Sequence, residues 1–131
     1  MTGAPTLLPP SDAAWLEDAY PGHEVAEEAG MTCVVVPAVA LPPGYDRLTA
    51  DVLVRLPPLF PDLAPDMWWT DPPLTLANGS PPAATELREI HLGRTWQRWS
   101  RHLPADQWRP GTDGLRTYVA QVKAELRRTA A

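Results

Sequence analysis

Apolar and polar residues alternate most clearly between residues 48 and 56, which predicts a β-strand there. The alternating positions are Asp51, Leu53 and Arg55 on one side and Val52, Val54 and Leu56 on the other. We expect residues 31–41 to form a buried strand that is bent or bulged at Pro37, because proline cannot donate to a sheet ladder. Residues 23–28 and 67–70 predict an edge strand and a further short strand, so the sequence indicates an antiparallel meander of three to four strands.

The spacing of apolar residues changes to that of a helix at both ends of the chain. Residues 13–20 predict a short helix that Ser11 caps and that buries Trp15. A second helix is predicted near the C-terminus, with Thr112 or Asp113 as its N-cap. Its apolar stripe at helical spacing consists of Leu115, Tyr118, Val119, Val122 and Leu126.

Residues 78–108, between the strands and the last helix, show little predicted structure. A segment of that length in a compact domain is often functional. The order of helix, strands, long loop and helix predicts an α+β fold in which a helix packs on an antiparallel sheet. We expect residues 1–10 to be an extended lead-in and residues 11–131 to form a single domain.

The composition narrows the class of protein. The formal net charge of −5 and the isoelectric point near 5.0 argue against a general nucleic-acid binder, which would be basic. No signal peptide and no proline-free apolar segment long enough to span a membrane is visible, so the expected location is the cytoplasm, away from membranes. The one cysteine, Cys33, lies in an apolar β-branched run and is expected to be a small buried hydrophobe rather than a thiolate.

Candidate chemistry is concentrated in residues 95–102, Thr-Trp-Gln-Arg-Trp-Ser-Arg-His. Ser100 is a candidate nucleophile, but a serine hydroxyl needs an activating base at neutral pH. His102 is the first candidate base and His91 the second; the competing interpretation is that Ser100 merely caps a turn. A local basic patch lies beside Trp96 and Trp99, either as a solvated face or as a docking surface for an acidic protein tail. It consists of Arg88, Arg94, Arg98 and Arg101.

Two further segments carry a resemblance to a known family. Phe60-Pro61-x-x-x-Pro65 follows a predicted strand, and Gln107-Trp108-Arg109-Pro110 precedes the predicted last helix. In this order they resemble the Tyr-Pro-x-x-x-Pro corner and the Gln-Trp-Ser-Pro segment of ubiquitin-conjugating (UBC) enzymes. The Trp-x-x-Trp-Ser-Arg-His run is similar to the bacterial branch of that superfamily. The resemblance covers roughly residues 11–128 and implies the UBC-like fold.

The resemblance also implies a site. In that family the catalytic cysteine precedes the tryptophan by about eight residues, and Ser100 stands at that distance before Trp108. It therefore implies an acyltransferase that accepts a ubiquitin-like protein from a ThiF-like activating enzyme as an oxyester on Ser100 and passes it to a target, without a cofactor or metal. A role in bacterial antiphage defence is the biological setting that it suggests.

Other residues take roles in that site. Arg98 and Arg101 are candidates to offset oxyanion charge. The residues expected to shape the site structurally are Trp96, Trp99, Trp108, Pro61 and Pro65. His91-Leu92-Gly93 stands near the place of the family's His-Pro-Asn motif, so the oxyanion-steadying asparagine has no obvious counterpart.

Alternatives follow from the same residues. The alternative interpretation is that the chain is a catalytically inactive UBC-fold scaffold that binds a ubiquitin-like protein or an activating enzyme, since a fold does not imply activity. The three histidines lack the i,i+4 spacing of a zinc helix, and Trp99-Ser100-Arg101 is not the Gly-x-Ser-x-Gly elbow of a hydrolase. Asp106 is the residue nearby that is available to orient a histidine.

Overall fold

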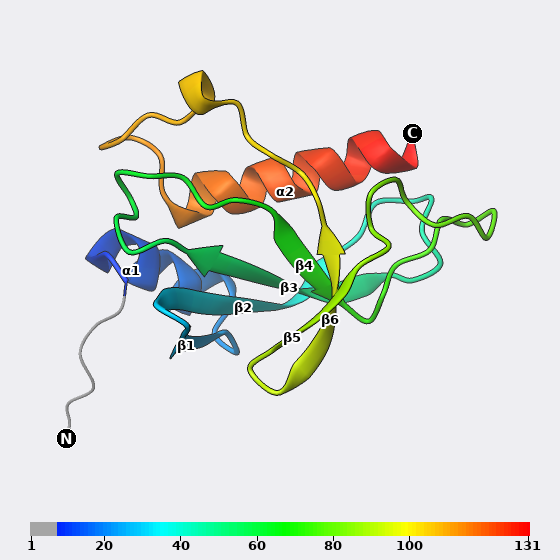
Figure 1. The fold of residues 1–131 in the computed structure, drawn as a ribbon, viewed down its shortest axis with the longest axis horizontal. Helices are drawn as coiled ribbons and strands as arrows, with labels where there is room; N and C mark the ends of the chain where they lie inside the picture. Colours follow the sequence, from blue (N-terminus) through cyan, green and yellow to red (C-terminus); the bar gives the residue numbers. More distant parts are fainter. Residues whose placement is uncertain (1–7) are drawn as a thin grey trace.

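The described residues of the computed structural model, 8–131, fold into one antiparallel sheet with a helix at each end of the chain. The elements in chain order are α1 (Pro10–Ala19), β1 (Glu24–Glu28), β2 (Met31–Ala40), β3 (Thr49–Leu56), β4 (Trp68–Asp71), β5 (Arg88–His91), β6 (Arg94–Trp99), a short 3-10 helix (Ala105–Gln107) and α2 (Leu115–Ala130). Helix α2 runs along the sheet, with α1 near its N-terminal end (Figure 1). The α+β class is as predicted.

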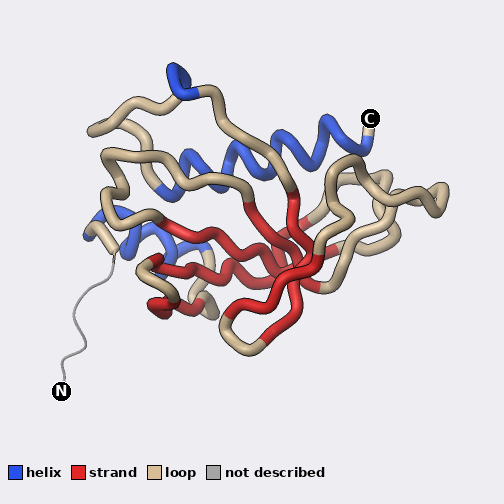
Figure 2. Tube along the Cα trace, viewed as in Figure 1, coloured by secondary structure: helices blue, strands red, loops and turns tan. Residues whose placement is uncertain are grey.

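The strand order in the sheet is β1-β2-β3-β4-β6-β5, and every neighbouring pair is antiparallel. The first four strands form the predicted meander, and the β5–β6 hairpin adds to it through β6. The sheet curls, so that the tip of this hairpin approaches the turn between β1 and β2 (Figure 2). The two edge strands, at opposite ends of the strand order, therefore come close at their turns.

The prediction of three to four strands and a long irregular loop at residues 78–108 was wrong. Within the described residues the sheet has six strands, and the last two, β5 and β6, lie inside that stretch. The signal was weak because β5 has only 4 residues and β6 only 6. Leu92 and Gly93 form the two-residue loop of the β5–β6 hairpin, and both have the positive φ (55° and 74°) that such tight loops require.

Both faces of the sheet carry buried apolar residues, in two separate clusters. The larger cluster lies between the sheet and the helices and includes Val34, Val52, Trp68, Trp99 and the apolar stripe of α2. The smaller one, on the opposite face, consists of Cys33, Val35, Leu53, Trp69 and Trp96. Strands β2, β3, β4 and β6 each supply residues to both clusters, and those of β3 alternate with the predicted period of two.

A β-bulge interrupts β2 at Pro37, as predicted. The register with β3 shifts between Val36 and Val39, and the freed N–H of Ala38 donates to Asp51 Oδ1 at 2.9 Å. The extra residue lets Val36 and Val39 both face the helices, although residues three apart in a regular strand point to opposite faces.

Helix α1 begins earlier in the chain than the sequence predicted, and helix α2 begins later. Helix α1 has Pro9 at its N-cap and Pro10 at its first position, so Ser11 lies inside the helix rather than capping it. The remainder of the predicted lead-in, residues 1–7, lies outside the described residues. Among the described residues, no helix is long and apolar enough to cross a membrane.

Helix α2 starts at Leu115 with Gly114 as its N-cap, so the prediction of Thr112 or Asp113 as the N-cap was wrong. Leu115 N–H donates to Asp12 Oδ1 of α1 at 3.2 Å, and Gly114 N–H donates to Thr117 Oγ1 at 2.9 Å. A Cβ atom at position 114 would lie 2.8 Å from Asp12 Oδ1, so glycine at this position leaves room for the Asp12 carboxylate. The predicted apolar stripe of α2 is buried along its whole length.

Candidate functional site

Ser100 lies immediately after β6, half-buried, where the chain leaves the sheet. Its backbone N–H donates to the carbonyl of Ala84 at 3.1 Å. Its Oγ accepts a hydrogen bond from Arg98 Nε at 3.3 Å. Residues two apart on an extended chain point to the same side, which explains why these two side chains meet. Within the described residues this is the only side-chain hydrogen bond of Ser100, so its hydroxyl proton is uncommitted.

His102, the first candidate base, points elsewhere. Its Nδ1 lies 2.7 Å from Asp66 Oδ1, in the loop before β4, and no hydrogen bond joins it to Ser100 in the described part of the chain. The side chains of His102 and Asp66 are 66% and 62% exposed, so neither is fixed by packing. A neutral His102 that donates Nδ1–H to Asp66 keeps the lone pair of Nε2 as a proton acceptor.

His91, the second candidate base, is buried at the end of β5 between two carboxylates. Its Nδ1 lies 3.0 Å from Glu28 Oε1, and its Nε2 lies 3.0 Å from Glu89 Oε1. Both contacts are hydrogen bonds only when each ring nitrogen carries a proton, and then neither nitrogen can accept one. The geometry does not bring His91 into contact with Ser100.

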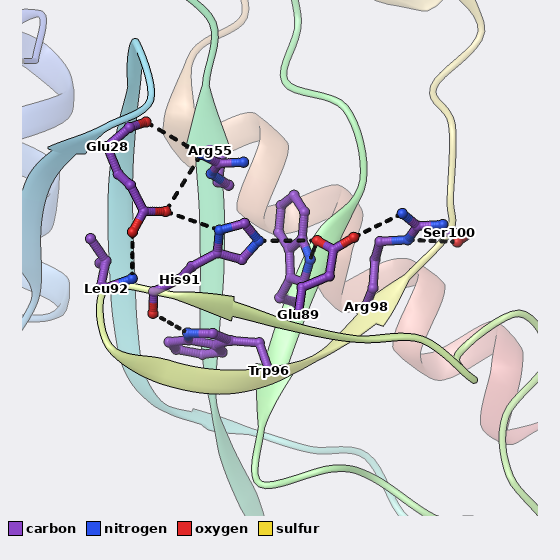
Figure 3. A network of polar contacts seen from close by, with 9 residues as sticks. Glu28, Arg55, Glu89, His91, Leu92, Trp96, Arg98 and Ser100 are labelled. Atoms are coloured by element: carbon purple, nitrogen blue, oxygen red, sulfur yellow. Dashed lines mark hydrogen bonds and ion pairs between the residues drawn. The ribbon is translucent and has the colours of Figure 1, made fainter.

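A chain of polar contacts nevertheless connects His91 to Ser100 (Figure 3). It runs from Glu28 through His91 to Glu89, from Glu89 Oε2 to Arg98 NH1 at 2.9 Å, and from Arg98 Nε to Ser100 Oγ. We call these five residues the hairpin network. It links the β1–β2 turn to the end of β6.

The carboxylates of the hairpin network are held in their ionised form. For Glu28, the N–H of Leu92, at 2.7 Å, and the His91 ring lower the pKa below its ordinary value of 4.5. Burial by itself would raise the pKa of Glu89, but hydrogen bonds from His91, Trp69 and Arg98 outweigh it and the pKa is lowered. The network therefore carries two anionic side chains, one of which, Glu89, is paired with the cationic Arg98.

Arg101 faces away from Ser100 toward helix α2. Its Nε donates to Glu125 Oε2 at 2.8 Å and its NH1 to the carbonyl of Ala83 at 2.8 Å, while the guanidinium lies 5.1 Å from the centre of the Trp99 ring. Of the two arginines expected to offset oxyanion charge, Arg98 contacts the Ser100 hydroxyl, whereas the guanidinium of Arg101 is committed to α2 and Trp99.

Trp96 and Trp99 are both fully buried but lie on opposite faces of the sheet. Trp99 stacks on Trp68, with ring centres 4.4 Å apart, and donates its Nε1–H to Thr70 Oγ1 at 3.0 Å. Trp96 donates to the carbonyl of His91 at 3.1 Å. The two tryptophans thus anchor the strand that ends at Ser100.

The proline corner and the Gln-Trp-Arg-Pro segment contact each other, 47 residues apart in the chain. Trp108 Nε1 donates to the carbonyl of Pro61 at 2.8 Å, and its ring lies 6.1 Å from that of Phe60. Pro65 is buried in the same corner. The segment that carries Ser100 therefore runs between β6 and this packed pair.

The thiol of Cys33 is not accessible at the surface that carries Ser100. It is 0% exposed, on the face of the sheet opposite the helices. As it is the single cysteine of the sequence, a thioester on this chain would require the side chains that cover Cys33 to move away. Three of the four arginines of the predicted basic patch are paired with carboxylates of this chain. Arg98 pairs with Glu89, Arg101 with Glu125, and Arg94 with both Asp51 and Asp71.

A pocket of about 410 Å³ lies beside the segment after β6, against helix α2. Its walls include Arg101, His102, Tyr118 and Glu125. In the described part of the chain no group of three or more His, Cys, Asp or Glu side chains is placed to hold a metal ion.

Three residues of this region escaped the sequence analysis. Asp66, rather than Asp106, orients His102, and Glu28 and Glu89 enclose His91. Glu89 lies two residues before His91 on the same face of β5, a spacing that would have suggested the contact had the strand been recognised. Glu28 is 63 residues away in sequence and gave no signal.

The chain combines an N-terminal helix, a curled antiparallel sheet, a packed proline corner and a C-terminal helix, which is the α+β arrangement expected for an E2-like protein. The model of the prokaryotic E2 family E matches residues 8–129, nearly the full length, so the chain belongs to that family. This confirms the resemblance to prokaryotic E2-like proteins. No curated protein and no solved structure matches the chain significantly.

Membership of a prokaryotic E2 family gives the protein a general role in ubiquitin-like conjugation. It implies a transferase of that system, and interaction with a ubiquitin-like protein and an activating enzyme.

Proposed function

We propose that this E2-like protein accepts the C-terminus of a ubiquitin-like protein as an oxyester on Ser100 and passes it to a target. The observation that carries the proposal is the hydrogen bond from Arg98 Nε to Ser100 Oγ at the end of β6. A guanidinium that donates to a hydroxyl oxygen stabilises the negative charge that this oxygen gains as it loses its proton. The burial of Cys33 supports a hydroxyl rather than a thiol as the acceptor.

The transfer replaces one ester by another. Ser100 Oγ attacks the carbonyl carbon of the modifier's C-terminal thioester on a ThiF-like activating enzyme. The new C–O bond forms, the C–S bond breaks, the thiolate of the activating enzyme leaves with the electron pair, and the serine proton passes to a base. Because an alkoxide is a poorer leaving group than a thiolate, the second transfer, to an amine or hydroxyl of the target, needs further activation.

His102 is the base that we assign to the first step. Its Nδ1 faces Asp66, which leaves Nε2 to accept the proton, and its exposed side chain is free to turn toward Ser100 when the partner binds. Catalytic hydrogen bonds are often long or absent before substrate binds. Arg101 then acts indirectly, by holding the segment after Ser100 against α2 through Glu125.

A second candidate function is a scaffold that binds the ubiquitin-like protein or the activating enzyme without becoming acylated. The observation that favours it is that, in the described residues, no base contacts Ser100 and both nearby histidines are engaged by carboxylates. The two functions differ in one measurable species, the covalent adduct.

The experiment combines the protein with the activating enzyme and ubiquitin-like protein from the same genome and with ATP, followed by denaturing gels. We expect an adduct that resists thiol reductant and is cleaved by hydroxylamine. Ser100→Ala abolishes it, and Ser100→Cys converts it to a reductant-sensitive thioester. His102→Gln slows its formation roughly 10²- to 10⁴-fold, the usual contribution of a general base.

Two variants serve as controls. Ser80→Ala removes an exposed serine in the loop before β5 and should leave the adduct unchanged. Cys33→Ser tests the buried thiol and should also leave it unchanged. An identical adduct on the Ser100→Ala variant rules out Ser100 as the acceptor, and stable co-purification of the partners with no adduct at any time establishes the scaffold.

A further inference from the structure

We infer that Glu89 and His91 are positioning residues that aim the guanidinium of Arg98 at Ser100 Oγ, an assignment that rests on the proposed function. Neither residue contacts Ser100. Glu89 holds Arg98 directly, and His91 holds Glu89, so both act through Arg98 (Figure 3). This gives His91 a role other than the proton acceptor that its position in the sequence suggested.

Glu89 is the centre of the hairpin network because it accepts three hydrogen bonds. Oε1 accepts from Trp69 Nε1 at 2.9 Å and from His91 Nε2 at 3.0 Å, and Oε2 accepts from Arg98 NH1 at 2.9 Å. Two fixed donors on Oε1 orient the carboxylate, so Oε2 is presented to Arg98 in one direction. A carboxylate is required, because an amide would place an N–H₂ group against one of these donors.

The orientation of Arg98 follows from this contact. An arginine side chain has several rotatable bonds and loses rotamer entropy when it is fixed, so a free Arg98 would adopt many orientations. With NH1 held by Glu89, the planar guanidinium points its Nε–H toward Ser100 Oγ. The Arg98–Ser100 distance of 3.3 Å is the longest in the hairpin network, so it is the contact most sensitive to a loss of orientation.

His91 is in turn anchored from the other edge of the sheet. Glu28, at the end of β1, contacts His91 Nδ1 through Oε1 and the N–H of Leu92 through Oε2, at 3.0 and 2.7 Å. Arg55 of β3 lies 3.6 Å from the same carboxylate. The tip of the β5–β6 hairpin is therefore tied to the β1–β2 turn, and this tie fixes the imidazole that orients Glu89.

The test observes Arg98 directly, by NMR of its side-chain Nε–H in the full-length ¹⁵N-labelled protein at neutral pH. In the wild-type protein we expect a resolved Nε–H resonance that is protected from exchange with water. Ser100→Ala should shift it, which verifies the contact with the hydroxyl. Glu89→Gln should increase its exchange with water at least tenfold, and His91→Gln should do so to a smaller extent, because Glu89 then keeps Arg98 but loses one of its own two orienting donors.

Arg94→Gln is the matched control. Arg94 belongs to the same strand and face and bonds Asp51 and Asp71 at 3.0 and 2.8 Å, but it lies outside the hairpin network. The control variant removes an ion pair of similar exposure while it leaves the Arg98 signal unchanged. Circular dichroism of each variant verifies that the sheet is intact.

Adduct formation supplies the functional half of the test. We expect Glu89→Gln to lower the maximal rate of adduct formation ten- to hundredfold, roughly the effect of a small misplacement of a catalytic group, and to leave the half-saturating concentration of activating enzyme unchanged. An equal loss in Arg94→Gln would show that general weakening of the hairpin is responsible and would overturn the inference.

The two proposals fail in different ways. If the Arg98 Nε–H signal is as protected in Glu89→Gln as in the wild-type protein, the positioning role is wrong, whatever happens to the adduct. If the signal responds as expected but no adduct forms on any variant, the positioning of Arg98 stands while the acyl-acceptor function of Ser100 is lost.

Discussion

The two faces of the sheet bury apolar side chains by different means. On one face, α1 and α2 cover the larger cluster, and its few buried polar groups satisfy one another, as when Gln97 Oε1 accepts from Thr70 and the N–H of Leu74. On the other face none of the described helices packs. There, Trp69 and Trp96 are covered by charged side chains, with Arg94 lying 4.3 Å from the centre of the Trp96 ring.

This difference explains why the candidate site lies where it does. A face closed by ion pairs places several ionisable groups in a fixed geometry close to solvent, whereas a helix-covered face is closed mainly by apolar side chains. The charged side chains that cover the second face include Glu89 and Arg98. Arg98 bonds Glu89 and also donates a hydrogen bond to the hydroxyl of Ser100. The same side chains thus protect a small core and surround a candidate nucleophile.

The largest expected effect is the loss of Trp99. Trp99→Ala should lower the free energy of unfolding toward the upper end of the range of about 3–5 kcal/mol for a buried tryptophan, because the helices and Trp68 cannot close the cavity. Trp96→Ala should fall toward the lower end, because the side chains above it are partly exposed and can move inward. Urea denaturation followed by circular dichroism measures both. Equal losses would show that the cover of charged side chains is as rigid as a helix.

Removal of Arg94 is expected to have a smaller effect. Arg94→Ala leaves Asp51 and Asp71 without their shared cation and uncovers Trp96, so we expect a loss of about 1–2 kcal/mol. Arg128→Ala is the comparison on the helix side. Its pair with Glu125 is exposed and Arg101 still holds that carboxylate, so the change should stay within about 0.5 kcal/mol. A larger loss for Arg128 than for Arg94 would contradict the contrast between the two faces.

The smallest expected effect is a difference in pH dependence between the faces. The pKa of Glu89 is lowered in the folded state, so its contribution to stability is present above 4.5 and is lost as the pH falls below that value. Burial raises the pKa of Asp12 above 3.8, more than its bond from Leu115 lowers it, so protonation of Asp12 favours the folded state and its contribution is lost as the pH rises. Thermal unfolding between pH 6 and 3 should therefore show a shallower acid loss in Glu89→Gln and a steeper one in Asp12→Asn. Identical slopes in all three proteins would refute this assignment.

Much of the fold was predictable because its signals are local. The alternation in residues 49–56, the bulge at Pro37 and the apolar stripe of α2 each depend on neighbours within a few positions. The β5–β6 hairpin was not predicted, because its strands are short and its buried tryptophans, three apart, face opposite sides of the sheet. Such a pattern matches neither the period of a half-buried strand nor that of a helix.

The candidate site was predictable only in part, for the same reason. Position 100 was found from its distance to Trp108, a property of the sequence, and Arg98 from its nearness in the chain. The partners of both histidines were not found, since Asp66 and Glu28 lie 36 and 63 residues from the side chains that they contact. The sequence does not show which distant carboxylate will contact a given histidine, because such a contact forms only when the chain has folded and the strands have paired.

The sequence by itself determined both helices, the first four strands, the family and the position of the candidate nucleophile, because periodicity and motif spacing are properties of the chain itself. The tertiary structure decided which charges meet. The curl of the sheet brings the β1–β2 turn to the β5–β6 hairpin and so places Glu28 against His91, and the pairing of β5 with β6 brings Glu89 to Arg98. That outcome depends on strand order and sheet curvature, which are properties of the whole packed chain rather than of any segment.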